Sequence, residues 1–103
     1  MTLIEFLRLP LEEKIKGVWL SGTEGEGEYI KCWNNGLVCE HYYYKNGEPH
    51  GECKWWHNGG QLWYHTRYKD GKRHGEYKAW DRDGELYIHS LFENGTIIKD
   101  YLK

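Results

Sequence analysis

From Val18 onward, apolar and polar residues alternate in short runs that Gly and Asn interrupt. Alternation of this kind, bounded by turn residues, predicts antiparallel β-strands. The strands expected are 18–21, 28–33, 37–44, 50–57, 61–68, 74–81, 85–92 and 96–101. Because only short connections separate them, we expect an all-β fold: a single-layer antiparallel meander of β-hairpins with a short helical cap at the N-terminus.

Glycines that follow Asn or Asp mark the expected connections. The segments 34–36, 58–60 and 82–84 read Asn-Asn-Gly, Asn-Gly-Gly and Arg-Asp-Gly, which suits three-residue hairpin loops. The last residue of such a loop takes the left-handed backbone conformation, which glycine adopts without a steric cost. We therefore expect a hairpin at each of these segments.

Residues 1–16 follow another pattern and predict a short, broken helical cap. Thr2 and Glu5 have the spacing of a capping box, and Pro10 interrupts the apolar run that follows. Covering the first edge of the sheet is the favoured role, because open edges invite unwanted strand pairing. Docking of a partner by this segment is the alternative.

The strongest pattern in the chain is a repeat with a period of 24 residues. Tyr-Lys-Asn-Gly at 44–47 returns as Tyr-Lys-Asp-Gly at 68–71 and as Phe-Glu-Asn-Gly at 92–95. A fixed period means that each unit stacks on its neighbours. We expect one domain, 1–103, with the hairpin repeats in 18–101. The positions expected to be structural within the repeat are Gly47, His50, Gly51, Trp56, Gly71, His74, Gly75 and Trp80.

Loop length decides which side chains share a face, because side chains alternate along a strand. A three-residue loop at 58–60 places Trp56 opposite Leu62, so that even-numbered residues share one face throughout. That face is expected to hold a core ladder at 44, 56, 68, 80 and 92. The odd-numbered face is expected to carry the candidate partner-binding residues, which are Trp55, Trp63, His65, Arg67, Tyr77 and Tyr87.

Composition narrows the classes of function. Six Trp and nine Tyr against two Phe give most rings a polar edge, which suits half-exposed surfaces. The formal net charge is -2, whereas proteins that bind nucleic acid or acidic lipid usually carry an excess of basic residues. Stacking on single-stranded nucleic acid is thus a minority interpretation, and a protein partner fits the rings better, since Trp, Tyr and Arg are enriched in interface hot spots.

The three cysteines, Cys32, Cys39 and Cys53, come without a signal-peptide pattern. An odd count in such a chain predicts free thiols in a reducing compartment, so we expect a cytoplasmic location. A disulfide between Cys32 and Cys39, which flank the loop 34–36, is the disfavoured alternative. The initial Met and the cap favour a whole protein over a fragment.

Histidines recur at the repeat step as His41, His65 and His89, but they do not predict a metal site. Two strand spacings separate neighbours in this series, which puts them about 10 Å apart. Two ligands of one zinc ion need nitrogens within roughly 3.5 Å of each other. Catalysis is not expected either, because Ser90 and His89 are adjacent on a strand and point to opposite faces. We assign no catalytic residue, metal or cofactor.

The segments 47–52 and 71–76, each preceded by Tyr-Lys-Asn or Tyr-Lys-Asp, share the pattern Gly-x-x-His-Gly-Glu. This pattern, followed by Trp and then by Gly-x-Leu after an Asn or Asp turn, resembles the variant MORN repeats of bacterial toxin–antitoxin-associated and giant-virus proteins. The resemblance covers about 24–99, although its first copy is degenerate. It implies a β-hairpin array that acts in protein–protein interaction or scaffolding. Members of the family are credited with dimerisation, phospholipid binding or toxin neutralisation.

The expected function is non-enzymatic protein binding or scaffolding through an aromatic sheet surface, with an antitoxin-like role as one form. The alternatives are a structural role with self-association near 96–101, giving a homo-oligomer, and peripheral phospholipid binding, which the net charge supports least. We expect Trp63→Ala to weaken partner binding without unfolding the chain. Trp80→Ala, in the core ladder, is expected to unfold it.

Overall fold

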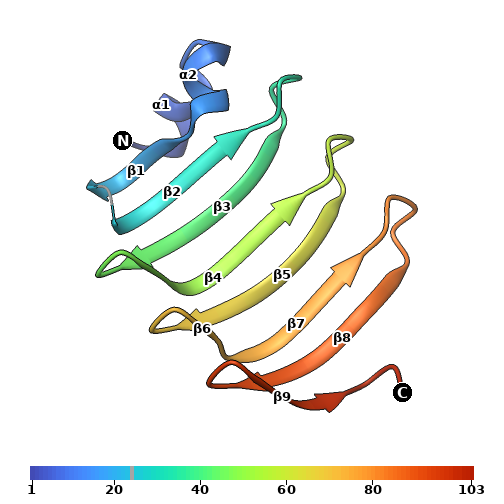
Figure 1. Ribbon diagram of the computed structural model, residues 1–103. Coiled ribbons are helices and arrows are strands. Elements are labelled where there is room, and N and C mark those ends of the chain that lie inside the picture. The colour runs from blue at the N-terminus through green and yellow to red at the C-terminus, as the bar shows by residue number, and fades with distance from the viewer. Residues whose placement is uncertain (24) are drawn as a thin grey trace.

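The chain forms one open antiparallel sheet with two short helices at its N-terminal end (Figure 1). The computed structural model describes residues 1–23 and 25–103, so Glu24, where the family resemblance begins, lies outside the described residues. The elements are α1 (Leu3–Leu7), α2 (Leu11–Lys16), β1 (Val18–Thr23), β2 (Glu26–Cys32), β3 (Val38–Lys45), β4 (Glu48–Trp56), β5 (Leu62–Lys69), β6 (Lys72–Arg73), β7 (Gly75–Trp80), β8 (Leu86–Glu93) and β9 (Thr96–Asp100).

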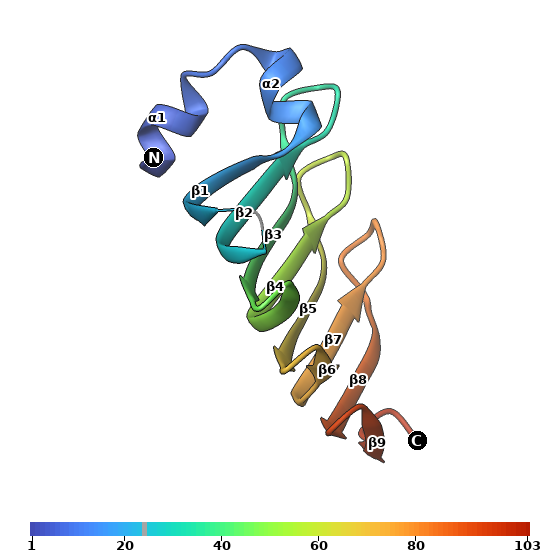
Figure 2. The same ribbon diagram turned by 60° about the vertical axis from the view of Figure 1, so that its left-hand side comes forward.

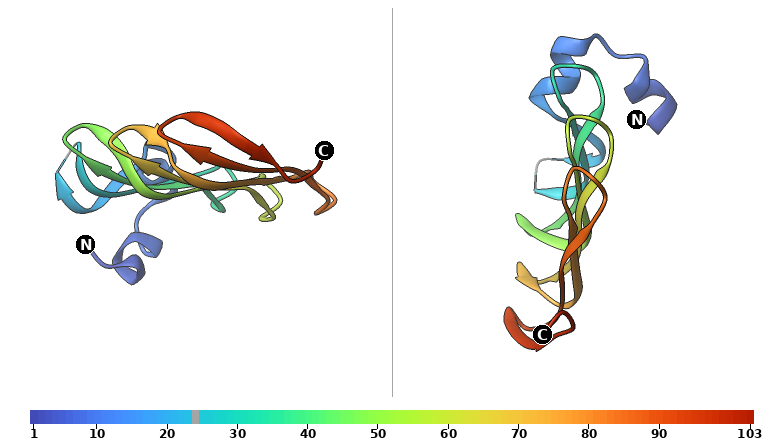
Figure 3. Two further views of the ribbon diagram at one scale, coloured as in Figure 1. Left: turned by 90° about the horizontal axis from the view of Figure 1, so that it is seen from below. Right: turned by 90° about the vertical axis from the view of Figure 1, so that its right-hand side faces the viewer.

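The strand order β1-β2-β3-β4-β5-β7-β8-β9 follows the chain, and β6 adds a short pairing with β5. The predicted antiparallel meander is thereby confirmed. The molecule measures 44 × 35 × 17 Å and consists of a single layer of strands, as the edge-on view in Figure 3 shows. Successive hairpins are offset like steps in Figure 2. A sheet without a second layer leaves most of its side chains half-buried.

One end of the hairpins carries the predicted three-residue loops; we call it the loop end. The His57 amide donates to the Gln61 carbonyl at 2.8 Å, and the Gly60 amide donates to the His57 carbonyl at 2.9 Å. Gly36 and Gly60 have φ values of 88° and 96°, in the left-handed region. The loops at 34–36, 58–60 and 82–84 therefore close as expected.

The opposite end, which we call the turn end, closes more tightly than predicted. Lys45 lies opposite Glu48, so Asn46 and Gly47 alone form the turn, with φ values of 52° and 77°. Two consecutive residues at positive φ are typical of the type I′ turn that Asn-Gly favours. The same turn recurs at 70–71 and 94–95. At this end, β3 and β4 consequently extend beyond the predicted 37–44 and 50–57, whereas at the loop end each is one residue shorter than predicted.

The predicted division of faces is wrong, because two features shift the pairing. A two-residue turn sets an even-numbered residue opposite an odd-numbered one, as with Tyr44 and Pro49. Beside the loop end, Trp56 lies opposite Leu62 as expected, but Trp55 lies opposite Tyr64. Trp63 is therefore an extra residue, a β-bulge. Equivalent bulges fall one repeat away on either side, at Cys39 and Tyr87.

The bulges and turns divide the predicted core ladder between both faces. Positions 44, 68 and 92 lie on one face, and the alternation of β4 and β7 puts Trp56 and Trp80 on the other. Both tryptophans are half-buried.

The N-terminal cap has the predicted capping box. The Glu5 amide donates to the Thr2 hydroxyl, and the Thr2 amide donates to the Glu5 carboxylate, each at 3.2 Å. Phe6 is fully buried and forms a cluster with the buried side chains of Leu20, Ile30 and Cys32. The helices thus pack on the first two strands, at the N-terminal edge of the sheet (Figure 1).

Candidate functional site

One face of the sheet carries an unbroken series of aromatic rings that crosses it from β1 to β8. Neighbouring ring centroids in the series lie between 5.1 and 6.4 Å apart. We call this surface the aromatic face; its rings are Trp19, Tyr29, Tyr44, Tyr42, Trp55, Tyr64, Tyr77 and Phe92.

Strand register brings these rings together. Tyr29 lies opposite Tyr42, and Trp55 lies opposite Tyr64, so each pair points to the same side of the sheet. Small residues lie between the rings on this face, and they are buried: Cys53, Thr66, Ala79 and Ser90. The large rings cover the small side chains, which gives a single layer of strands a thin core on this side.

The polar atoms of the central rings bond to one another. The Trp55 indole N–H donates to the Tyr42 hydroxyl, which in turn lies 3.4 Å from the hydroxyl of Tyr64. Burial raises the pKa of both Tyr42 and Tyr64 well above the ordinary range of tyrosine. These hydroxyls therefore stay neutral at physiological pH and hold the rings in place.

The three thiols are buried and free, so they are expected to resist modification. Burial raises the pKa of Cys39 to about 11 and that of Cys53 to about 12. Because the thiolate is the reactive form, we expect a disulfide-exchange reagent at pH ~8 to modify Cys53 of the native chain at least ~100-fold more slowly than that of the urea-unfolded chain. Immediate reaction of the native protein would contradict the burial seen here.

The central rings of the aromatic face stack nearly parallel to one another. The ring of Tyr64 lies between Trp55, at 6.0 Å and 23°, and Tyr77, at 5.8 Å and 12°. A nucleic-acid base needs a free ring face on which to stack. Because Trp55 and Tyr77 stack beside it on both sides, the half-buried ring of Tyr64 suits the apolar side chains of a protein better than it suits a base.

The other face of the strands is charged, and we call it the polar face. Its contacts between Glu and His recur at the repeat step: Glu28 with His41 at 2.6 Å, Glu52 with His65 at 3.7 Å, and Glu76 with His89 at 3.7 Å. Burial lowers the pKa of His65, although the nearby Glu52 opposes this shift. Each histidine of the series thus has a carboxylate on the same face. Among the described residues there is no cluster of three or more His, Cys, Asp or Glu suited to a metal ion.

The six predicted partner-binding residues do not share one face. Trp55 and Tyr77 belong to the aromatic face, whereas His65 and Arg67 lie on the polar face, where Arg67 contacts Glu52 at 3.0 Å. This separation corrects the prediction, and its cause is the pairing shift described above.

The remaining two predicted residues, Trp63 and Tyr87, occupy bulges near the loop end. Trp63 stacks on His57 at 4.9 Å and lies 6.3 Å from the ring of Trp55, so it extends the aromatic face. Its indole N–H donates to the Tyr87 hydroxyl at 3.1 Å. Tyr42, Tyr44 and Tyr64 also belong to this surface, although the parity of the sequence placed them on the opposite face from the predicted binding residues. The Asn-Gly turns could have revealed them, since a two-residue turn reverses the parity.

Several of the predicted structural positions connect one hairpin to the next. The Trp33 indole donates to the carbonyl of Trp56 at 3.0 Å, and one repeat further on the ring of His57 bonds to the carbonyl of Trp80 at 2.9 Å. At the turn end, the amides of Gly47 and Gly71 donate to carbonyls of the preceding hairpin.

The His-Gly pairs lie beside the turn end. Gly51 and Gly75 have φ values of 86° and 93°, a conformation that side chains disfavour. The Nδ1 atom of His50 accepts a hydrogen bond from the amide of Asp70 at 3.3 Å, whereas Nδ1 of His74 is buried without a partner among the described residues.

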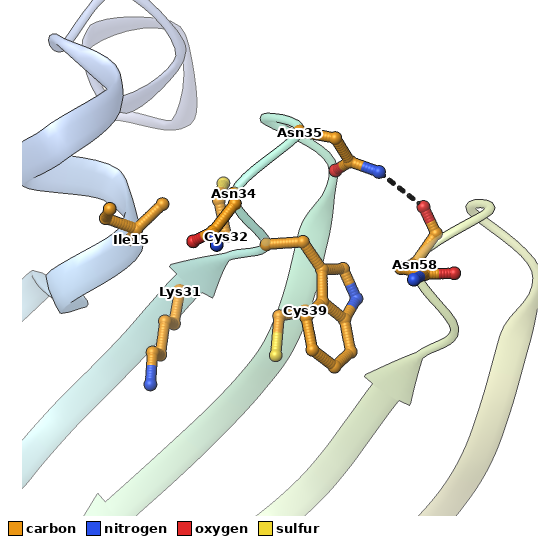
Figure 4. A pocket seen from close by; sticks show the side chains of 8 residues that line it. Ile15, Lys31, Cys32, Asn34, Asn35, Cys39 and Asn58 are labelled. Atoms are coloured by element: carbon orange, nitrogen blue, oxygen red, sulfur yellow. Dashed lines mark hydrogen bonds between the residues drawn. The ribbon is translucent and has the colours of Figure 1, made fainter.

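A hollow of about 450 Å³ lies between α2 and the loop end of β2 and β3 (Figure 4). The Asn35 side chain beside it donates to the Asn58 carbonyl at 2.6 Å and links two loops. Burial raises the pKa of both thiols that line it, Cys32 and Cys39. Among the described residues that line it, Lys31 alone is charged, so they bring together no acid–base pair.

No protein-family model matches the chain, and a search of curated proteins found no match. In the part of the chain that the structure describes, neither helix has the length and apolar character of a membrane span.

Proposed function

We propose that this protein is a non-enzymatic interaction or scaffolding module that binds a protein partner through its aromatic face. The observation that carries the proposal is the unbroken series of rings, of which those from Tyr42 to Phe92 lie beyond the strands that the helices cover. Contiguous apolar surface rimmed by polar residues is typical of interaction sites. Tyrosine and tryptophan also carry much of the energy in protein interfaces.

The geometry of the repeat supports a place among the MORN-type hairpin arrays. The glycine of the Asn-Gly turn and that of the His-Gly pair both have positive φ, which glycine adopts most easily. This backbone conformation explains why both glycines of the pattern Gly-x-x-His-Gly are repeated. A scaffold of this type presents one long surface, and toxin neutralisation is one form that such binding takes. The hydrogen bonds that join Trp55, Tyr42 and Tyr64 hold the rings of this surface together, which supports a binding role.

Self-association is the second candidate, and the last strand favours it. β9 lies at the end of the strand order, and Ile97 and Ile98 are 51% and 53% exposed. Open sheet edges of this kind pair with other strands. Light scattering separates the two candidates, since a monomer that binds a different protein supports the first.

The proposed function is tested by truncating one ring of the aromatic face. We expect Trp63→Ala to weaken binding of a protein retained from the source-cell lysate by at least ~10-fold, which corresponds to a modest hot spot. The control is Arg67→Ala on the polar face, which should retain the same protein. The circular dichroism of both variants should match that of the wild type. Equal loss in both variants would contradict the choice of face.

A further inference from the structure

Arg73 is a cation on the aromatic face with no acidic partner in the described part of the chain. It lies opposite Tyr68, and its guanidinium carbon stands 4.7 Å from the ring centroid of Tyr77 and 5.7 Å from that of Phe92. Its Nε atom is buried and has no hydrogen-bond partner among the described residues. The Lys and Arg residues found in the described ion pairs are others: Lys54, Arg67, Lys78 and Lys103.

The hairpin itself does not require a charge at this position. Pro49 stands one repeat earlier, opposite Tyr44, and Ile97 stands one repeat later, opposite Phe92. The same place in the neighbouring hairpins is therefore filled by apolar residues. Half-burying a guanidinium without a carboxylate costs free energy that an apolar residue would not cost. The charge of Arg73 thus calls for an explanation outside the fold.

A shallow hollow of about 360 Å³ adjoins Arg73 at the turn end. Tyr68, Lys72 and two turn glycines line it together with Arg73, so both of its charged lining residues are basic. Glu48 packs near Gly71 at the rim, but the described ion pairs join it to neither cation. An acidic group brought by a partner would find complementary charge here, beside the rings of the aromatic face.

We propose that Arg73 anchors an acidic side chain of the partner, an Asp or Glu that is flanked by apolar residues. The guanidinium forms paired hydrogen bonds with the carboxylate, while Tyr77 and Phe92 exclude water from the pair and hold the guanidinium in position. The flanking residues contact the ring edges of Tyr64 and Tyr77. This inference rests on the proposed function and names the chemistry of the partner that the aromatic face selects.

The test uses the intact chain and a displayed library of random peptides. We expect the selected peptides to be enriched in Asp or Glu next to Leu, Ile, Phe or Trp. For the best synthetic peptide, Arg73→Gln should weaken binding at least ~10-fold by fluorescence anisotropy, as expected for loss of a desolvated charge pair. Arg82→Gln, the same substitution in an exposed loop at the opposite end, should leave the affinity within ~2-fold.

A charge exchange separates a direct contact from an indirect effect. The variant Arg73→Glu should reject the selected peptide and bind a version in which Lys replaces the acidic residue. Thermal unfolding of Arg73→Gln should not fall below that of the wild type, because the hairpin does not need the charge. Failure of the exchange to restore binding would overturn the direct contact.

The outcomes also separate this inference from the proposed function. Peptides that require Trp63 but show no acidic enrichment and no loss with Arg73→Gln would overturn the role of Arg73 and leave the binding face intact. Absence of any selected peptide would overturn both. So would binding of the chain only to phosphatidylserine vesicles, or only to itself.

Discussion

Replacing Phe6 by alanine is expected to lower the free energy of unfolding by about 3–5 kcal/mol. Phe6 has no exposed surface and is among the largest fully buried side chains of the described residues. It fills the contact between α1 and the sheet, where Leu20, Ile30 and Cys32 are also buried. A short helix cannot close over the space left by a lost ring, so a cavity term adds to the lost transfer free energy. Urea denaturation followed by far-UV circular dichroism measures the change.

The matched control lies one residue further along the same helix. Leu7 is 54% exposed, and Leu7→Ala should change the free energy of unfolding by less than ~0.5 kcal/mol. Phe6→Ala and Leu7→Ala change the helix propensity of α1 by similar small amounts, but the side chains that they remove differ in burial. Similar losses in both variants would show that α1 contributes through helix formation instead of packing. No loss in either variant would show that the hairpins fold without the cap.

The expected size of the Phe6 effect reflects the thinness of the molecule. The molecule measures 17 Å in its shortest dimension, and its described residues bury apolar surface mainly in two places: under the cap and between the rings of the aromatic face. Each of these two places stabilises only part of the sheet. Stability is therefore expected to depend strongly on a few positions and weakly on the rest, as in other stacked-unit architectures.

Features of the fold that depend on local backbone chemistry were predictable from sequence. The final glycines of the loops at 34–36 and 58–60 have the positive φ that the three-residue loop predicts, and Thr2 and Glu5 form the expected capping box. In each case one or two residue types satisfy a geometric requirement that few others meet. Such requirements are visible in a single sequence.

The allocation of side chains to faces was not predictable with the same means, because it depends on counting. Without the extra residue at Trp63, the even-numbered side chains of β4 and β5 would share a face. With it, the residues of β5 after Trp63 pair with residues of β4 of the opposite parity, as Tyr64 does with Trp55. A bulge of this kind has no strong residue preference, and its recurrence at Cys39 and Tyr87 shows three different residue types in the same role. The candidate site therefore combined residues of both faces, whereas the fold class did not depend on the parity.

Differences between repeats are the best guide to function within this architecture. Positions that serve the backbone recur, as do the Glu–His pairs of the polar face. Positions opposite the turn-end aromatic residues vary between Pro49, Arg73 and Ile97. Where the residue type differs between repeats although the backbone conformation is the same, the fold does not determine the residue, and its side chain is available to contact a partner. We therefore expect the residues that determine partner specificity to lie at the turn end of the aromatic face.

Replacing Trp55 by alanine is expected to destabilise the chain by about 3 kcal/mol, although sequence interpretation assigned this residue to partner binding. Its ring contacts those of Tyr42, Trp63 and Tyr64, and its indole N–H bonds to the Tyr42 hydroxyl. Removing it opens the middle of the ring series and leaves that hydroxyl with one partner fewer. Urea denaturation monitored by circular dichroism gives the magnitude.

Trp55→Phe separates packing from hydrogen bonding at the same position. It keeps an aromatic ring in the series but removes the donor to Tyr42, so a loss of about 1 kcal/mol is expected. If Trp55→Ala lowers the free energy of unfolding by less than ~1 kcal/mol, the stability of the sheet does not depend on packing between these rings. If the larger loss is found, reduced partner binding by Trp55→Ala has no simple interpretation, because the variant disturbs the surface itself. Binding is then better probed at the margins of the series, at Trp63 and Arg73, where the chemistry of recognition can change while the sheet beneath stays folded.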